Sequence, residues 1–145
     1  MSVPELELTR SEVGPQLRLA RLWWGLGWGM VLFILASTLA PDRYVPDLHI
    51  WDKAEHALAF FGLTFWFGGL LSRGRYPVIG FVMLLLGGGI ELAQGAMNWG
   101  RDEDILDFLA DSVGISVALG LLYVGLGAWL QWVERLVWPA RNESA

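Results

Sequence analysis

Residues 22–40 read LWWGLGWGMVLFILASTLA, a run of nineteen residues without a charged side chain. An α-helix rises about 1.5 Å per residue, so a run of this length comes close to spanning the ~30 Å hydrocarbon core of a bilayer. The run is longer than the usual apolar core of a signal peptide. Its aromatic residues Trp23, Trp24 and Trp28 are typical of interfacial anchors. We therefore expect a retained membrane helix rather than a cleaved leader.

Three further apolar segments follow, separated by turn-forming or charged stretches. They cover residues 54–71, 77–97 and 105–133. None of them alternates polar and apolar residues with period two, which argues against strands. The sequence thus predicts an all-α polytopic membrane protein with four transmembrane helices in a compact bundle. The predicted organisation is an amino tail (1–21), a four-helix transmembrane domain (22–133) and a carboxyl tail (134–145).

The composition agrees with a membrane protein and excludes several other classes. Hydrophobic residues make up 54 % of the chain, mean hydropathy is +0.45, and there are nine Trp and eighteen Gly. The net charge of −5 argues against nucleic acid as a partner. The absence of Cys excludes disulfides and thiolate metal sites.

The basic residues predict the orientation. Seven of the ten fall in segments that four spans would place on one side: Arg10, Arg18, Arg21, Arg73, Arg75, Arg135 and Arg141. The positive-inside rule then puts both termini in the cytoplasm. The outer side carries ten acids and three bases, a net charge of about −7. The cytoplasmic side carries five acids and seven bases, a net charge of about +2.

Ionisable residues within the predicted spans gather near their outer ends. The candidate ligand-binding residues are Asp52, Lys53, His56, Glu91, Gln94, Arg101, Asp104, Asp107 and Asp111. Asp52 and His56 share a helix face, as do Glu91 and Gln94. Because three polar stripes at one depth cannot all face lipid, we expect one pocket that opens to the outer surface.

The pocket carries more acids than bases, and several functions fit it. Protonation, a divalent cation, or a cationic or amine-bearing ligand would each neutralise the excess. One His with several carboxylates suits Zn²⁺, Mn²⁺ or Mg²⁺, but this ligand set is not diagnostic, and a metal cofactor is not the favoured interpretation. The candidate catalytic residues are His56, Glu91, Asp104 and Asp107. The structural alternative is a hydrogen-bond network between helices, with Asp104 as a helix cap.

These residues resemble the motifs of the VanZ-like family of small integral membrane proteins. The matching pieces are Asp52-Lys53-x-x-His56, Glu91-x-x-Gln94 and Arg101-x-x-Asp104-x-x-Asp107-x-x-x-Asp111-x-x-Gly114. The family often has Asn where this chain has Asp111. The resemblance implies a multi-pass protein of the bacterial cytoplasmic membrane and a role in the cell envelope. The family is linked to resistance to the glycopeptide antibiotic teicoplanin, and no settled reaction comes with it.

We therefore expect the protein to lie among membrane lipids and to bind the head group of an envelope lipid or cell-wall precursor in the outer pocket. Chemical modification of that head group is an extension of the same hypothesis. Whether the protein is an enzyme is left open by the residues. The alternative is a non-enzymatic accessory subunit that docks another membrane protein through its polar and small-residue helix faces. A cation carrier ranks last, because no ionisable residue lies in the inner half of any predicted span.

Overall fold

The structure, a computed structural model of the 145-residue chain, describes residues 15–40, 49–97 and 104–138, without the side chains of residues 49–52. The described residues are helical and include no strand, which confirms the predicted all-α class. The long helices of the described chain are α2 (Ala20–Thr38), α3 (His49–Leu70), α4 (Tyr76–Met97) and α5 (Ile105–Tyr123). A shorter helix, α6 (Trp129–Val137), follows them. Two 3₁₀ turns, η2 (Arg73–Arg75) and η3 (Leu126–Ala128), precede α4 and α6.

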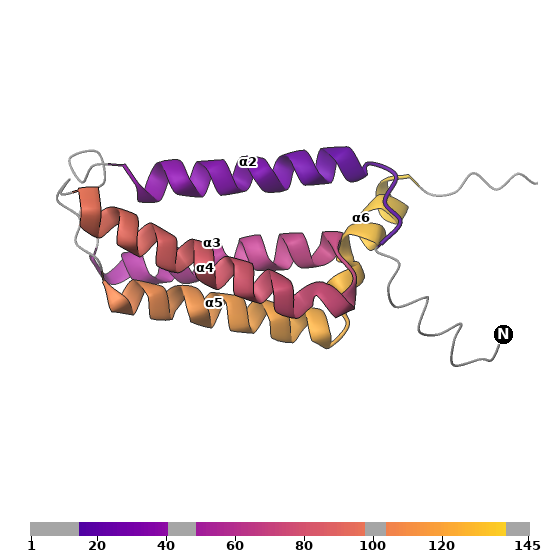
Figure 1. The fold of residues 1–145 in the computed structure, drawn as a ribbon. Helices are drawn as coiled ribbons and strands as arrows, with labels where there is room; N and C mark the ends of the chain where they lie inside the picture. The colour runs from indigo at the N-terminus through magenta and orange to yellow at the C-terminus, as the bar shows by residue number, and fades with distance from the viewer. Residues whose placement is uncertain (1–14, 41–48, 98–103, 139–145) are drawn as a thin grey trace, which may run out of the picture.

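Helices α2 to α5 lie alongside one another and run in alternating directions, while α6 lies across one end (Figure 1). Among the described residues, three helical stretches are long and apolar enough to cross a membrane: Ala20–Thr38, Arg73–Met97 and Ile105–Tyr123. By their length and composition these stretches support a membrane protein. The bundle has two ends. We call the end where α3 and α5 begin the polar end, and the opposite end, where α2 begins, the α6 end.

The fourth apolar segment is shorter than predicted. Helix α5 ends at Tyr123 rather than near residue 133. Gly125 follows with φ +119°, a left-handed backbone conformation that glycine adopts without a steric penalty. The predicted boundary after residue 133 therefore falls inside α6. Hydropathy does not reveal this break, because residues 124–133 include no charged side chain.

Helix α3 forms the centre of the bundle. It packs most extensively against α5 and also contacts α2, α4 and α6. Its Phe60 and Leu63 side chains are completely buried. Gly114 of α5 lies against the Ala57 carbonyl of α3, so closely that a Cβ atom would overlap it. Glycine at this position allows the two backbones to approach, as small residues do in membrane bundles.

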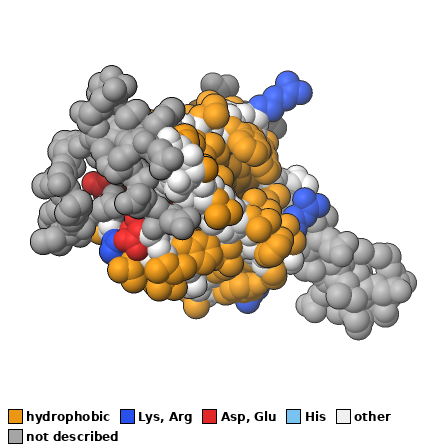
Figure 2. Space-filling view, turned by 60° about the vertical axis from the view of Figure 1, so that its left-hand side comes forward, with side chains coloured by type: hydrophobic (Ala, Val, Ile, Leu, Met, Phe, Trp, Pro, Cys, Tyr) orange, Lys and Arg blue, Asp and Glu red, His pale blue; other side chains and the backbone are white. Residues whose placement is uncertain are grey.

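The outer faces of α2, α4 and α5 are apolar. Large exposed hydrophobic side chains on them include Leu32, Phe33, Phe81, Leu85, Leu92 and Val113. Figure 2 shows hydrophobic side chains over much of one face, with the visible charged side chains towards its edges. A soluble monomer rarely exposes an apolar surface this continuous, whereas lipid chains cover such a surface readily.

Candidate functional site

The end of α4 and the start of α5 are joined at the polar end by backbone and side-chain hydrogen bonds. Asp104 caps α5, because its side chain accepts from the backbone N–H of Leu106 at 2.8 Å. The backbone N–H of Asp104 in turn donates to Glu91 Oε2 at 2.9 Å. The capping role that was the structural alternative for Asp104 is thus real. It also places Asp104 beside a buried residue of the predicted pocket.

Lys53 connects α3 to the first turn of α5. Its Nζ lies 2.7 Å from Asp104 Oδ2 and 2.9 Å from Asp107 Oδ1. The hydrogen bond from the Lys53 ammonium and that from the Leu106 N–H lower the pKa of Asp104 below its ordinary value. The Lys53 side chain remains 41 % exposed, so its charge can still reach a group outside the bundle.

Deeper in the bundle, His56 of α3 pairs with Asp111 of α5. His56 Nδ1 lies within hydrogen-bond distance of Asp111 Oδ1, at 3.0 Å, and both side chains are buried. Gly87 of α4 lies against the same carboxylate, since a Cβ atom there would be 2.7 Å from Asp111 Oδ2. Glycine at this position makes room for a carboxylate in the core. The Asp111 carboxylate therefore has a histidine as its partner.

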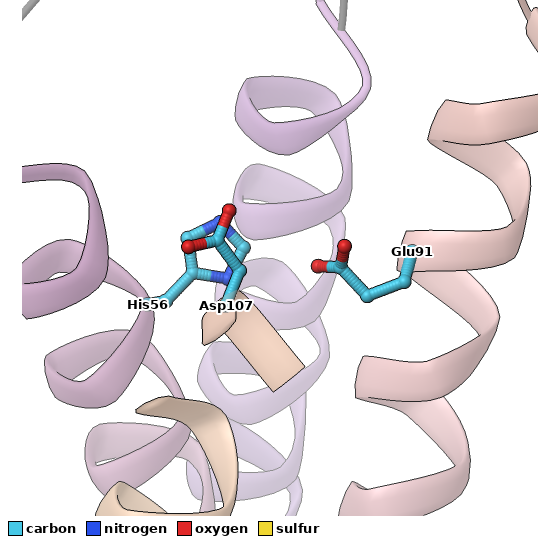
Figure 3. A group of neighbouring side chains, drawn as sticks. All are labelled: His56, Glu91 and Asp107. Atoms are coloured by element: carbon cyan, nitrogen blue, oxygen red, sulfur yellow. The ribbon is translucent and has the colours of Figure 1, made fainter. Parts of the chain in front are cut away.

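Three predicted site residues from three helices form one cluster. His56, Glu91 and Asp107 are all buried, and each offers a ligand atom within 4.8 Å of those of the other two. Figure 3 shows Glu91 extending from α4 towards the other two side chains, with the Asp107 carboxylate in front of the imidazole. We call these three residues the His-Glu-Asp cluster. The expectation that polar stripes of three helices converge is met by these residues.

Three other predicted site residues, Gln94, Asp52 and Arg101, are not part of the His-Glu-Asp cluster as the structure describes it. Gln94 is buried, but its Nε2 donates to the Thr38 carbonyl at 2.8 Å, which connects α4 to the end of α2. Asp52 belongs to α3, but its side chain is outside the described part of the structure, as is the whole of Arg101. The two residues are therefore not placed relative to the cluster.

The most fully hydrogen-bonded carboxylate among the described residues is not one of the predicted site residues. Glu134 of α6, predicted to start the carboxyl tail, is only 4 % exposed. It accepts from the backbone N–H groups of Arg18 and Leu19 at 2.7 and 2.9 Å, and from Trp23 Nε1 at 2.7 Å. A carboxylate from α6 thereby binds the two residues that directly precede α2. Trp23, predicted as an interfacial anchor, is an internal hydrogen-bond donor.

The polar end combines the groups that general acid–base chemistry, phosphate binding and metal binding require. The imidazole of His56 is oriented by a carboxylate, and the Lys53 ammonium is partly exposed. Comparison of the chain with protein-family models, curated proteins and solved structures finds no significant match. The site is therefore interpreted from its own geometry.

Proposed function

We propose that the chain is a VanZ-like protein of the bacterial cytoplasmic membrane that binds the head group of an envelope lipid or cell-wall precursor at the polar end. The observation that carries this proposal is the convergence of Lys53 and the His-Glu-Asp cluster from three helices. Ionisable groups at membrane depth are costly and usually serve a ligand or a proton. A head group with phosphate and amine would match the ammonium and carboxylates here.

In this proposal α3 is the fourth membrane span. It is as long as α4, with 22 residues, or about 33 Å of helix. Its charged residues lie in its first two turns, and its remaining length is apolar. Because α3 is the most enclosed helix, it tolerates charges that a lipid-facing helix would not. With four spans both termini are cytoplasmic, and the polar end faces outward.

The orientation is tested by thiol labelling, which the absence of native Cys makes simple. Single Cys residues replace Trp99 and Ser72, and intact cells are treated with a membrane-impermeant thiol reagent. We expect labelling at position 99 and protection at position 72. The reverse pattern would place the polar end in the cytoplasm. It would then exclude cell-wall precursors on the outer face of the membrane as ligands.

Head-group binding is tested with single variants in the purified chain. Lipids that copurify in mild detergent are identified by mass spectrometry for wild type, His56→Ala and Lys53→Gln. Loss of one charge-assisted hydrogen bond should weaken retention of a bound lipid by about tenfold. Glu55→Gln is the matched control, since Glu55 is exposed on α3 beside His56. The same variants in a teicoplanin-sensitive host test the envelope role. Folded variants with unchanged lipid content and unchanged susceptibility would refute the proposal.

One observation supports the accessory-subunit alternative. Gly25 and Gly29 on α2, and Ser116 and Gly120 on α5, are exposed with four-residue spacing. Apart from the adjoining residues and the backbone of the same helix, no atom of the described chain lies within 4 Å of a Cβ placed on any of these three glycines. Such faces allow a second membrane helix to approach closely. Gly25→Leu with Gly29→Leu should then abolish copurification of a partner, and purification of the wild type as a lone protomer would count against this alternative.

A further inference from the structure

Glu91 has an unsatisfied oxygen inside the polar end. The residue is 7 % exposed, and its Oε2 accepts from the Asp104 backbone. Its Oε1 is buried and has no hydrogen-bond partner among the described residues. This carboxylate points towards His56 and Asp107 (Figure 3). A buried carboxylate oxygen without a partner is unfavourable, and in native proteins an ordered water, a bound ion or a catalytic role accounts for one.

The imidazole in the same cluster is held as a metal ligand would be. Asp111 is completely buried and its Oδ1 lies 3.0 Å from His56 Nδ1. In the tautomer in which Nδ1–H donates to this carboxylate, Nε2 carries the lone pair of the neutral imidazole. Metal-binding histidines usually donate their other ring N–H to a carboxylate in this way. Lys53 similarly holds one oxygen of Asp107 at 2.9 Å.

The charges at the polar end also favour a cation. Among the described residues, four carboxylates face one ammonium there, namely Glu91, Asp104, Asp107 and Asp111 against Lys53. In a medium of low dielectric constant such an excess is strongly unfavourable. A divalent cation would offset two of these negative charges.

We propose that His56, Glu91 and Asp107 bind a divalent transition-metal ion, with Asp111 and Lys53 as positioning residues. Zn²⁺ matches this donor set best, because Mg²⁺ and Ca²⁺ prefer oxygen ligands alone. Two ligand atoms on a tetrahedral ion are about 3.4 Å apart. The ligand atoms of the three residues lie within 4.8 Å of one another, so each of these distances must shorten by no more than about 1.4 Å when the ion binds. A three-ligand site leaves one coordination position for water or a head-group oxygen. The ion binds whether or not the proposed head group does.

The experiment uses the full chain purified in mild detergent and stripped with a chelator. Zn²⁺ is titrated and the bound ion is counted by elemental analysis after dialysis. We expect one ion per chain and a rise in melting temperature on the order of 5 °C at saturation. Glu91→Gln and Asp107→Asn should each weaken binding about tenfold or more, as should Asp111→Asn. Glu55→Gln is the control that should bind as wild type.

Failure to bind Zn²⁺ in the wild type, or wild-type affinity in folded Glu91→Gln, would overturn the proposal. If the variants do not fold, Co²⁺ in the wild type decides: ligand-field bands of a four- or five-coordinate ion support the site, and the spectrum of hydrated Co²⁺ overturns it. Lipid content is measured separately. A chain that binds Zn²⁺ without a head group would refute the proposed function and leave the metal site standing.

Discussion

Two buried glutamates lie at opposite ends of the bundle, and their surroundings differ in kind. At the α6 end both oxygens of Glu134 accept hydrogen bonds, from Arg18, Leu19 and Trp23. At the polar end Glu91 accepts one, and its Oε1 has no partner among the described residues. A carboxylate satisfied within the fold stabilises the fold. A carboxylate that the fold satisfies only in part is the kind retained for binding.

Replacing Glu134 by alanine should cause the largest loss of stability. The change leaves three donors without their acceptor, two of them backbone N–H groups of the residues directly before α2. Hydrogen bonds to a charged group contribute about 1.5–3 kcal/mol each and are not additive, so we expect a loss of about 3 kcal/mol. Thermal unfolding in detergent, followed by tryptophan fluorescence, measures it. The control is Gln131→Ala on the same helix, and an equal loss in both variants would contradict a specific role for the Glu134 carboxylate.

The contrast between these two ends also explains what could be predicted from sequence. Long apolar runs predict helices, and the spacing of Asp104, Asp107 and Asp111 predicts a polar stripe on one of them. Which side chains meet depends on packing between distant segments, so the His56–Asp111 pair and the bond from Gln94 to Thr38 were not predictable.

The α6 end was missed for a related reason. Glu134 was placed in a tail because the apolar run before it continues past Tyr123 without a charge. Two glycines, at 125 and 127, were the signal that a turn separates two helices. After such a turn, one acid in a tryptophan-rich amphipathic stretch is a candidate for burial against the bundle.

Adding a methyl group at Gly87 should perturb the polar end. A Cβ atom there would be 2.7 Å from Asp111 Oδ2, whereas at Gly89 no atom of the described chain lies within 4 Å. We expect Gly87→Ala to cost about 1–2 kcal/mol and Gly89→Ala to be neutral or stabilising by up to about 1 kcal/mol, since alanine favours helix. Thermal unfolding of both variants provides the comparison. Equal stability would show that Asp111 is not confined by α4.

Glu91→Gln should change stability by no more than about 1 kcal/mol, in either direction, although it removes a buried charge. The amide oxygen of the variant side chain can still accept from the Asp104 N–H, although this hydrogen bond loses its charge assistance. Removing a buried charge that is only partly hydrogen-bonded offsets that loss. Glu134→Gln keeps fewer of its interactions and should destabilise clearly. Unfolding of the two variants in metal-free buffer measures the contrast. If Glu91→Gln lost as much stability as Glu134→Gln, then Glu91 would be a structural residue like its counterpart.

Acid should destabilise the α6 end through protonation of Glu134. The stabilisation that this carboxylate contributes should therefore depend on pH. Burial raises the pKa of this carboxyl, but the hydrogen bonds from Leu19, Arg18 and Trp23 outweigh it, so the net pKa lies below the ordinary 4.5. Folding thus favours the ionised form. The resulting stabilisation is complete above the unfolded-state pKa and is lost as the pH falls through the lower, folded-state pKa. The gap in melting temperature between wild type and Glu134→Gln should therefore stay constant from pH 7 to about 5 and narrow below about 4.5. A gap that persisted unchanged through that lower range would mean that the protonated carboxyl accepts these hydrogen bonds equally well, and that hydrogen-bond geometry rather than charge stabilises this end of the bundle.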